Sequence, residues 1–319
     1  MLQVPLEPAG TGPRWAALRP LCGHDEAAID GCGDLEATQL LERLLVAAPG
    51  TSVRPGGTWT LSVSDRDRLL AAVYRHLYGD RVEGTVRCTD CGAAFDLTFT
   101  LAELARGLES GRRTARTVGP DSEGTYVLPD GRRFRLPTAE DQIAVSGMAP
   151  EQGAEVLASR CLLAGDPAGD REALEAAMSE VGPVLDLDLG ATCAECGAPQ
   201  EVRFEIRAHL LGTLAAERPC LAREVHSIAT AYGWGLNEVL DLPRDQRRGY
   251  VRLIETERAG RRGPRACAAT CSGSSHPPGR RPDVDCAPSS PPAPRSPTST
   301  NGSGCPGSRR RAWARKAEA

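Results

Sequence analysis

The chain has 319 residues, of which 40% are hydrophobic and 25% are charged, and its net charge is −4. This length and composition are those of a soluble globular protein with one large domain or two ordinary ones. No apolar run approaches the roughly 20 residues of a membrane span, so we expect no membrane partner. Residues 1–20 lack the pattern of a secretory signal, which predicts a cytoplasmic protein. In that reducing compartment, the twelve cysteines are not expected to form a disulfide framework.

The charge is unevenly distributed along the chain. Residues 1–257 carry 26 Arg and 39 Asp and Glu, a net of −13, whereas residues 258–319 carry 12 Lys and Arg and 3 Asp and Glu, a net of +9. An acidic body lacks the clustered positive charge of a nucleic-acid-binding face, so we expect no nucleic-acid partner. Residues 258–319 hold 10 of the 25 prolines and few large apolar side chains, which predicts a disordered tail. The cysteines of this tail are interpreted as incidental thiols: Cys267, Cys271, Cys286 and Cys305.

The N-terminal part of the body begins with two predicted helices. Apolar spacing predicts the first over residues 35–48, and Ser64 with Asp67 three residues later predicts the start of the second. After Gly79, residues 82–86 and 95–99 have strand patterns and are predicted to be joined through a Cys-x-x-Cys-Gly turn. A second hairpin is predicted from residues 126–128 and 134–136, because an Asp-Gly pair between them suits a tight turn.

The rest of the body continues this alternation. Thr138, with Asp141 three residues later, predicts the cap of a helical stretch that reaches Val181 with breaks. Residues 185–189 and 202–206 are predicted strands on either side of a second cysteine turn, and helices broken near Arg218 and Gly233 follow as far as Glu257. We therefore predict an α+β fold, mainly helical, with short antiparallel β-hairpins that carry two zinc knuckles. Four parts are expected: residues 1–110 with the first knuckle, 111–182 with the linking hairpin and helices, 183–257 with the second knuckle and the C-terminal helices, and the tail 258–319.

The two cysteine turns belong to a longer repeat. Residues 86–101 align with residues 191–206 at a constant offset of 105 residues, with the cysteines, the following glycine and the apolar strand positions matched. A predicted helix precedes and follows each copy. The chain is therefore expected to consist of two related halves.

The cysteine spacing predicts one metal site. Zinc prefers four ligands at tetrahedral corners, and each Cys-x-x-Cys turn supplies two thiolates. The predicted ligands of one structural Zn²⁺ per chain are Cys88, Cys91, Cys193 and Cys196. Such a closed shell leaves no position for water or substrate, which predicts a structural, non-enzymatic role in which the ion clamps the two halves. Arg87 and Arg203 are hypothesised to offset the charge of the thiolates.

Other functions find less support in the sequence. A thioredoxin-like redox motif places its cysteines where a strand runs into a helix, whereas strands flank both pairs here. A cytosolic redox or metal-handling protein stays as the alternative. The residues between the cysteines of each pair carry no positive charge, which argues against a nucleic-acid-binding zinc ribbon.

Isolated candidates elsewhere are interpreted as structural. His24 and Glu26 beside Cys22 lack a second ligand cluster, and His226 near Glu224 has no nucleophile motif around it. His76 and His209 lie on predicted helices, where structural contacts are expected. Buried thiols are expected for the single cysteines of the body: Cys22, Cys32, Cys161 and Cys220.

Several blocks of the chain resemble a known family. Residues 221–234 (LAREVHSIATAYGW), 238–243 (EVLDLP) and 247–250 (RRGY), together with residues 18–26 (LRPLCGHDE) and the two Cys-x-x-Cys-Gly turns, are similar to the T4-type bacteriophage baseplate protein family, which also occurs with contractile injection systems. The likeness covers about residues 15–256. It implies a bacterial cytoplasmic protein that binds other baseplate or tail-assembly proteins, either as a component of a phage-tail-like particle or as an assembly chaperone.

The final helices contain the apolar residues of a possible partner-binding face. Whether they bind a partner or pack on the chain's own core is left open by the sequence. These residues are Val225, Ile228, Ala229, Tyr232, Trp234, Val239, Leu240 and Tyr250. The tail has no recognisable counterpart in the family.

Overall fold

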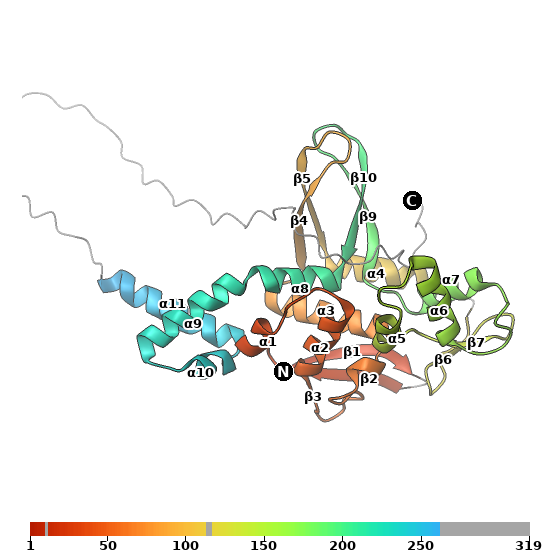
Figure 1. Cartoon of the computed structure of the whole chain (residues 1–319), viewed down its shortest axis with the longest axis horizontal. Helices are drawn as coiled ribbons and strands as arrows, with labels where there is room; N and C mark the ends of the chain where they lie inside the picture. Colours follow the sequence, from red (N-terminus) through yellow and green to blue (C-terminus); the bar gives the residue numbers. More distant parts are fainter. Residues whose placement is uncertain (10–11, 113–116, 262–319) are drawn as a thin grey trace, which may run out of the picture.

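Figure 1 presents a computed structural model of the chain, which describes residues 1–9, 12–112 and 117–261. The predicted α+β class is confirmed, since the described residues form eleven α-helices and small antiparallel sheets of two or three strands. The last helix continues to Arg261, three residues beyond the predicted start of the tail at residue 258. The rest of the tail, with its four cysteines, lies outside the described residues.

The first half begins with a hairpin that the sequence patterns do not predict. Strands β1 (Leu2–Ala9) and β2 (Gly12–Leu18) pair antiparallel, and the short β3 (Leu45–Val46) joins the other side of β2. Pro5 and Pro8 weaken the strand pattern of β1, but proline is tolerated there because β1 is an edge strand. The main-chain N–H of Glu7 on this edge donates to Asp65 of α3 at 2.7 Å, which protects the edge.

Helices fill the rest of the first half. Helices α1 (Gly23–Ala27) and α2 (Asp34–Leu44) lie between β2 and β3, and a 3₁₀ turn, η1 (Thr58–Thr60), leads into α3 (Val63–Tyr78). The prediction that α2 reaches residue 48 is wrong, because Leu45 turns extended and pairs with Leu18. The predicted cap of α3 is also wrong by two residues. Ser62, not Ser64, accepts the main-chain N–H of Asp65.

The second half repeats the order of the first. Strands β6 (Thr125–Val127) and β7 (Arg133–Arg135) form the predicted hairpin, helices α5 (Ala139–Ala144) and α6 (Pro150–Cys161) follow, and β8 (Leu162–Ala164) joins β7. Helix α7 (Arg171–Val181) then corresponds to α3. The strand orders β1-β2-β3 and β6-β7-β8 match, so the relation of the two halves extends well beyond the cysteine turns.

A shared capping device marks this relation at the residue level. Asp25 accepts two hydrogen bonds from Arg19 at 2.6 and 2.8 Å, and Asp141 is bound in the same bidentate way by Arg135. Each aspartate lies six residues after its arginine and three after its helix cap, Cys22 or Thr138. Burial alone would raise the pKa of Asp141, but the hydrogen bonds from Arg135, Thr138 and Arg160 hold it well below its usual range.

Each capping loop docks against the start of a helix from another part of the chain. Thr138 forms a β-bridge with Ser62, and the Val63 N–H donates to Pro137 at 2.9 Å. Cys22 forms the matching bridge with Pro243, at the start of the last helix. Helix α3 therefore closes the second half, and the C-terminal helices close the first half.

The C-terminal helices pack as a unit beside the body (Figure 1). They are α9 (Arg218–Tyr232), α10 (Leu236–Asp241) and α11 (Arg244–Arg261). Helix α8 (Ile206–Ala216), which packs on α3 of the body, leads into them. The side chain of Arg247 is 0% exposed and binds Glu26 and Glu224, each at 2.7 Å. Leu240 lies so close to Gly23 that a Cβ there would meet it at 2.7 Å. Burial of paired charges and this close approach fix α10 and α11 against α1.

The largest apolar core joins the two halves. It is formed mainly by β1, β2, α2 and α3 of the first half, but Phe204 of strand β10 (Pro199–Glu205) and Ile206, Leu210 and Leu214 of α8 belong to it as well. A smaller core fills the second half between β6, β7, α6 and α7. None of the described helices is long and apolar enough to cross a membrane.

We expect Asp141→Ala to lower the free energy of unfolding by about 2 to 3 kcal/mol, because it removes a helix cap and the two ion pairs that a buried carboxylate makes with Arg135 and Arg160. Urea denaturation measures this change. The control is Asp188→Ala at an exposed strand position, which we expect to alter stability by less than about 0.5 kcal/mol. A loss at Asp141 no larger than that of the control would contradict the structural role of the capping device.

Candidate metal centre

Two β-hairpins rise side by side from the helical body and meet at their turns (Figure 1). The first consists of β4 (Arg81–Arg87) and β5 (Ala94–Thr100), the second of β9 (Asp186–Thr192) and β10 (Pro199–Glu205). Their bounds and pairing registers differ by the same 105 residues throughout. Helix α4 (Leu101–Arg112) follows the first hairpin as α8 follows the second. We refer to the pair of hairpins as the tower.

The turns of the two hairpins have the same local geometry. The N–H of Cys88 donates to Ala93 at 2.9 Å, and the N–H of Gly92 donates back to Cys88 at 3.0 Å. The second turn has the same two bonds, at 3.0 Å each. Gly92 and Gly197 adopt φ values of 74° and 73°, a left-handed conformation that favours glycine. In each hairpin, the glycine after the second cysteine therefore lets the backbone fold back and bring both cysteines of the turn to the same side.

The four predicted cysteines come together at the tip of the tower. All four sulfur atoms lie within 4.8 Å of one another. The sulfurs of Cys88 and Cys196 are 3.6 Å apart, and those of Cys91 and Cys193 are 3.8 Å apart. A tetrahedral ion with metal–sulfur bonds of about 2.3 Å separates its ligands by about 3.8 Å, so the donor set and its spacing fit a four-thiolate metal site.

The tip has a buried side and an exposed side. Cys88 and Cys193 are buried with Phe95, against which Val86 and Ala191 pack, whereas Cys91 and Cys196 are exposed. At the foot of the tower, Phe99 and Phe204 meet edge to face with ring centroids 4.9 Å apart. The hairpins are thus held by aromatic packing at the foot and by a much smaller apolar cluster at the tip.

One further residue links the two turns. The side-chain carbonyl of Gln200, which is 6% exposed, accepts hydrogen bonds from the N–H of Thr89 at 2.9 Å and from its hydroxyl at 3.0 Å. Our sequence interpretation missed this link. The repeat offers a signal for it, because the position equivalent to Gln200 in the first hairpin is the buried Phe95, and a polar residue in such a place requires a partner.

The four thiols influence one another's ionisation. The N–H of Cys91, with that of Asp90 and the thiol of Cys196, lowers the pKa of Cys88 to about 7. The N–H of Ala198 would lower the pKa of Cys196, but the neighbouring sulfurs raise it to about 12. Four thiolates within a few ångströms require a cation to be stable together, so the cluster binds protons or a metal ion.

The two arginines that were predicted to offset the negative charge of the thiolates lie in different parts of the tower. The Arg87 guanidinium donates to the carbonyl of Gly92 at 3.3 Å, beside the first turn. Arg203 binds Asp186 at 2.8 Å and Glu205 at 3.0 Å, at the foot of the tower. The prediction for Arg203 is therefore wrong, because the acidic groups at the strand ends engage its side chain.

The foot of the tower also contains an aspartate with a raised pKa, Asp186. Burial and repulsion from Glu205, directly across the strands, raise the pKa of Asp186 to about 6 despite the contact with Arg203. A folded-state pKa above the unfolded one means that folding favours the protonated form. This contribution to stability is complete below pH 4 and is lost as the pH rises through 6.

We expect Asp186→Asn to remove this pH dependence. Relative to the variant, the wild-type free energy of unfolding should fall by about 1 to 2 kcal/mol between pH 5 and pH 8. Urea denaturation at each pH with excess zinc measures the difference, in which contributions common to both proteins cancel. Asp188→Asn, two residues along β9, is the matched control. A difference between wild type and Asp186→Asn that does not vary with pH would contradict the raised pKa.

The other sequence candidates do not assemble a reactive site. Glu26 and Glu224 bind Arg247, and His24 lies 3.3 Å from Asp241. His226 is exposed. Of the four single cysteines, Cys161 is buried as predicted, and burial raises its pKa to about 12. The prediction of buried thiols is wrong for Cys22, Cys32 and Cys220, which are only half-buried, and Cys32 is not a free thiol.

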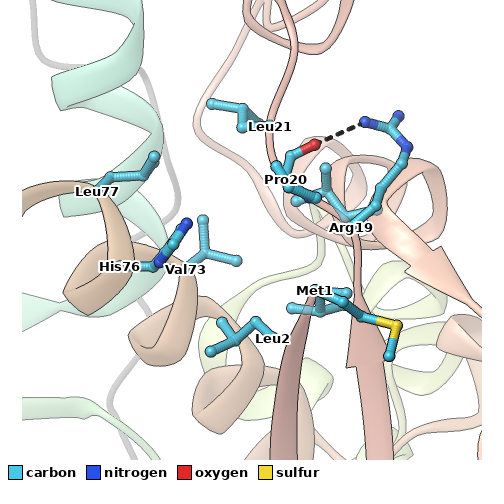
Figure 2. A pocket seen from close by; sticks show the side chains of 10 residues that line it. Met1, Leu2, Arg19, Pro20, Leu21, Val73, His76 and Leu77 are labelled. Carbon is cyan, nitrogen blue, oxygen red and sulfur yellow. Dashed lines mark hydrogen bonds between the residues drawn. The ribbon is translucent and has the colours of Figure 1, made fainter. Parts of the chain in front are cut away.

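A small hollow lies between the N-terminal hairpin and α3 (Figure 2). Apart from Arg19 and His76, its lining is apolar, and Arg19 is bound by Asp25 and by the carbonyl of Pro20. None of its ten lining residues is a serine, threonine, cysteine, lysine or carboxylate.

Comparison with protein-family models, with curated proteins and with solved structures finds no match for this chain.

Proposed function

We propose that the protein is a non-enzymatic structural protein in which one zinc ion, bound by Cys88, Cys91, Cys193 and Cys196, clamps two related halves. The observation that carries this proposal is the meeting of four sulfurs from turns 105 residues apart, at separations that suit a tetrahedral ion. An all-thiolate donor set favours zinc over calcium or magnesium, which prefer oxygen ligands.

The closed donor set supports a structural role for the ion. Four protein ligands would leave zinc no coordination position for water or substrate, so the ion would contribute to folding and not to catalysis. Its contribution would be greatest at the tip, where few apolar side chains hold the hairpins together. Zinc binding would then add to the contacts that already join the two turns.

We expect the purified chain to contain one zinc ion and Cys193→Ser to lose it. Loss of the ion should lower the free energy of unfolding by at least about 3 kcal/mol, because metal affinity contributes directly to folded-state stability. Elemental analysis and thermal denaturation with and without a chelator measure the two effects. The matched control, Cys220→Ser, lies outside the cluster and should keep its zinc. A metal-free chain that is fully folded would contradict the proposal. Thiols that are reversibly oxidised and then reduced by a dithiol would favour the redox alternative.

We also propose that the protein works by binding protein partners of a phage-tail-like baseplate, as a component or as an assembly chaperone. The resemblance of about residues 15–256 to the T4-type baseplate family supports this class of partner. The C-terminal helices supply a suitable surface. Ile228, Val239 and Ile254 form their internal core, whereas Leu236 and Leu253 are 59% and 57% exposed.

We expect Leu236→Glu combined with Leu253→Glu to abolish a complex with co-expressed baseplate proteins while leaving thermal stability unchanged, because both side chains are exposed in the free chain. Size-exclusion chromatography with light scattering measures complex formation. Leu163→Glu is the matched control, since Leu163 is 52% exposed on β8 in the second half. Unchanged binding by the double variant would contradict this surface, and no complex with the wild type would contradict the partner class.

A further inference from the structure

Two sulfur contacts of the cluster join one hairpin to the other. The sulfurs of Cys88 and Cys196 are 3.6 Å apart, and those of Cys91 and Cys193 are 3.8 Å apart. Each of these pairs combines a buried cysteine with an exposed one. These two contacts define a pair of cross-hairpin partners among the possible cysteine pairings.

Contacts other than the metal hold these partners together. Gln200 of the second hairpin binds Thr89 of the first turn through two hydrogen bonds, and Phe99 packs on Phe204 at the foot. Neither contact involves a sulfur atom. The sulfurs therefore stay adjacent when an ion leaves, which is the condition for disulfide formation between them.

We propose that the cluster has a second, covalent state: a peroxide oxidises the four thiolates to two disulfides, Cys88–Cys196 and Cys91–Cys193, which keep the two halves joined after the metal ion is released. This inference rests on the zinc clamp proposed above. It makes the cluster a junction that persists in both reducing and oxidising surroundings, with a metal ion in the first and covalent bonds in the second.

The chemistry assigns a separate role to each cysteine of a pair. In the zinc-bound cluster all four sulfurs would be thiolates, and those of Cys91 and Cys196 are exposed to a peroxide. Either of them attacks a peroxide oxygen, forming an S–O bond and releasing hydroxide as the O–O bond breaks. The buried thiolate of Cys193 or Cys88 then attacks that sulfur, forming the S–S bond and releasing a second hydroxide. For the whole cluster, four thiolates lose four electrons to two molecules of hydrogen peroxide, four protons are taken up, and four waters and one zinc ion are released.

The sequence between the cysteines makes the pairing measurable. The full zinc-loaded chain is treated with hydrogen peroxide, remaining thiols are alkylated, and the chain is cleaved without reduction beside Asp90 and Glu195. These acids separate the two cysteines of each turn, so mass spectrometry distinguishes all possible pairings. We expect Cys88–Cys196 and Cys91–Cys193 linked peptides, one zinc released per chain, and two peroxides consumed by the cluster.

The outcomes separate this proposal from the zinc clamp. A zinc-containing chain whose oxidation gives Cys88–Cys91 and Cys193–Cys196 pairs, or sulfinic acids, would overturn the covalent state and retain the clamp. A chain isolated without zinc that still forms both cross-hairpin disulfides would overturn the clamp and retain the junction.

Single variants give a second measurement. Cys91→Ser should still form the Cys88–Cys196 disulfide, and Cys196→Ser should still form Cys91–Cys193, because each variant keeps one complete pair. Each variant lacks one proposed zinc ligand, so circular dichroism first establishes that it is folded. Gln200→Ala should shift oxidation toward pairs within a turn at least twofold, whereas Gln246→Ala at an exposed position should not. If wild type and Gln200→Ala gave the same ratio of cross-hairpin to within-turn disulfides, Gln200 would have no role in positioning the sulfurs.

Discussion

The contact between two cysteine turns that are far apart in sequence is the constraint on which the tower depends. Because side chains alternate along a strand, a slip of one residue in either hairpin would turn its apolar positions away from the other hairpin. The pairs Arg87 with Ala94 and Thr192 with Pro199 close both ladders at the same register. Both turns have a left-handed glycine at the equivalent position. The same turn conformation therefore occurs twice, and the four sulfurs come together between the two turns.

The two halves are also joined away from the sulfurs. Helix α8, which follows the second cysteine hairpin, contributes to the core of the first half, and α3 of the first half receives the capping loop of the second. Hydrophobic burial therefore secures the body and the foot of the tower independently of any ion. The tip contains only a small apolar cluster, so the proposed zinc ion would act where little packing holds the hairpins together.

The elements predicted from sequence are those whose signal is local. The cysteine hairpins and the hairpin around Gly131 follow from alternation and turn residues, and the cap at Thr138 follows from a spacing of three. The β1–β2 hairpin was missed because prolines obscure its pattern. The contact of Arg247 with Glu26 spans 221 residues and that of Gln200 with Thr89 spans 111, and no local pattern encodes either. Sequence thus identified the cysteines but not the polar contacts that position them.

The docking of the capping loops differs from the metal centre in symmetry. At the tower, each half contributes one hairpin and two of the four cysteines. At the loops, α3 closes the second half, but α11, which has no copy elsewhere in the described chain, closes the first. The relation between the two halves is therefore broken at the C-terminal helices. A partner that bound these helices, as proposed above, would meet a single orientation of the molecule, although most of the described chain consists of two related units.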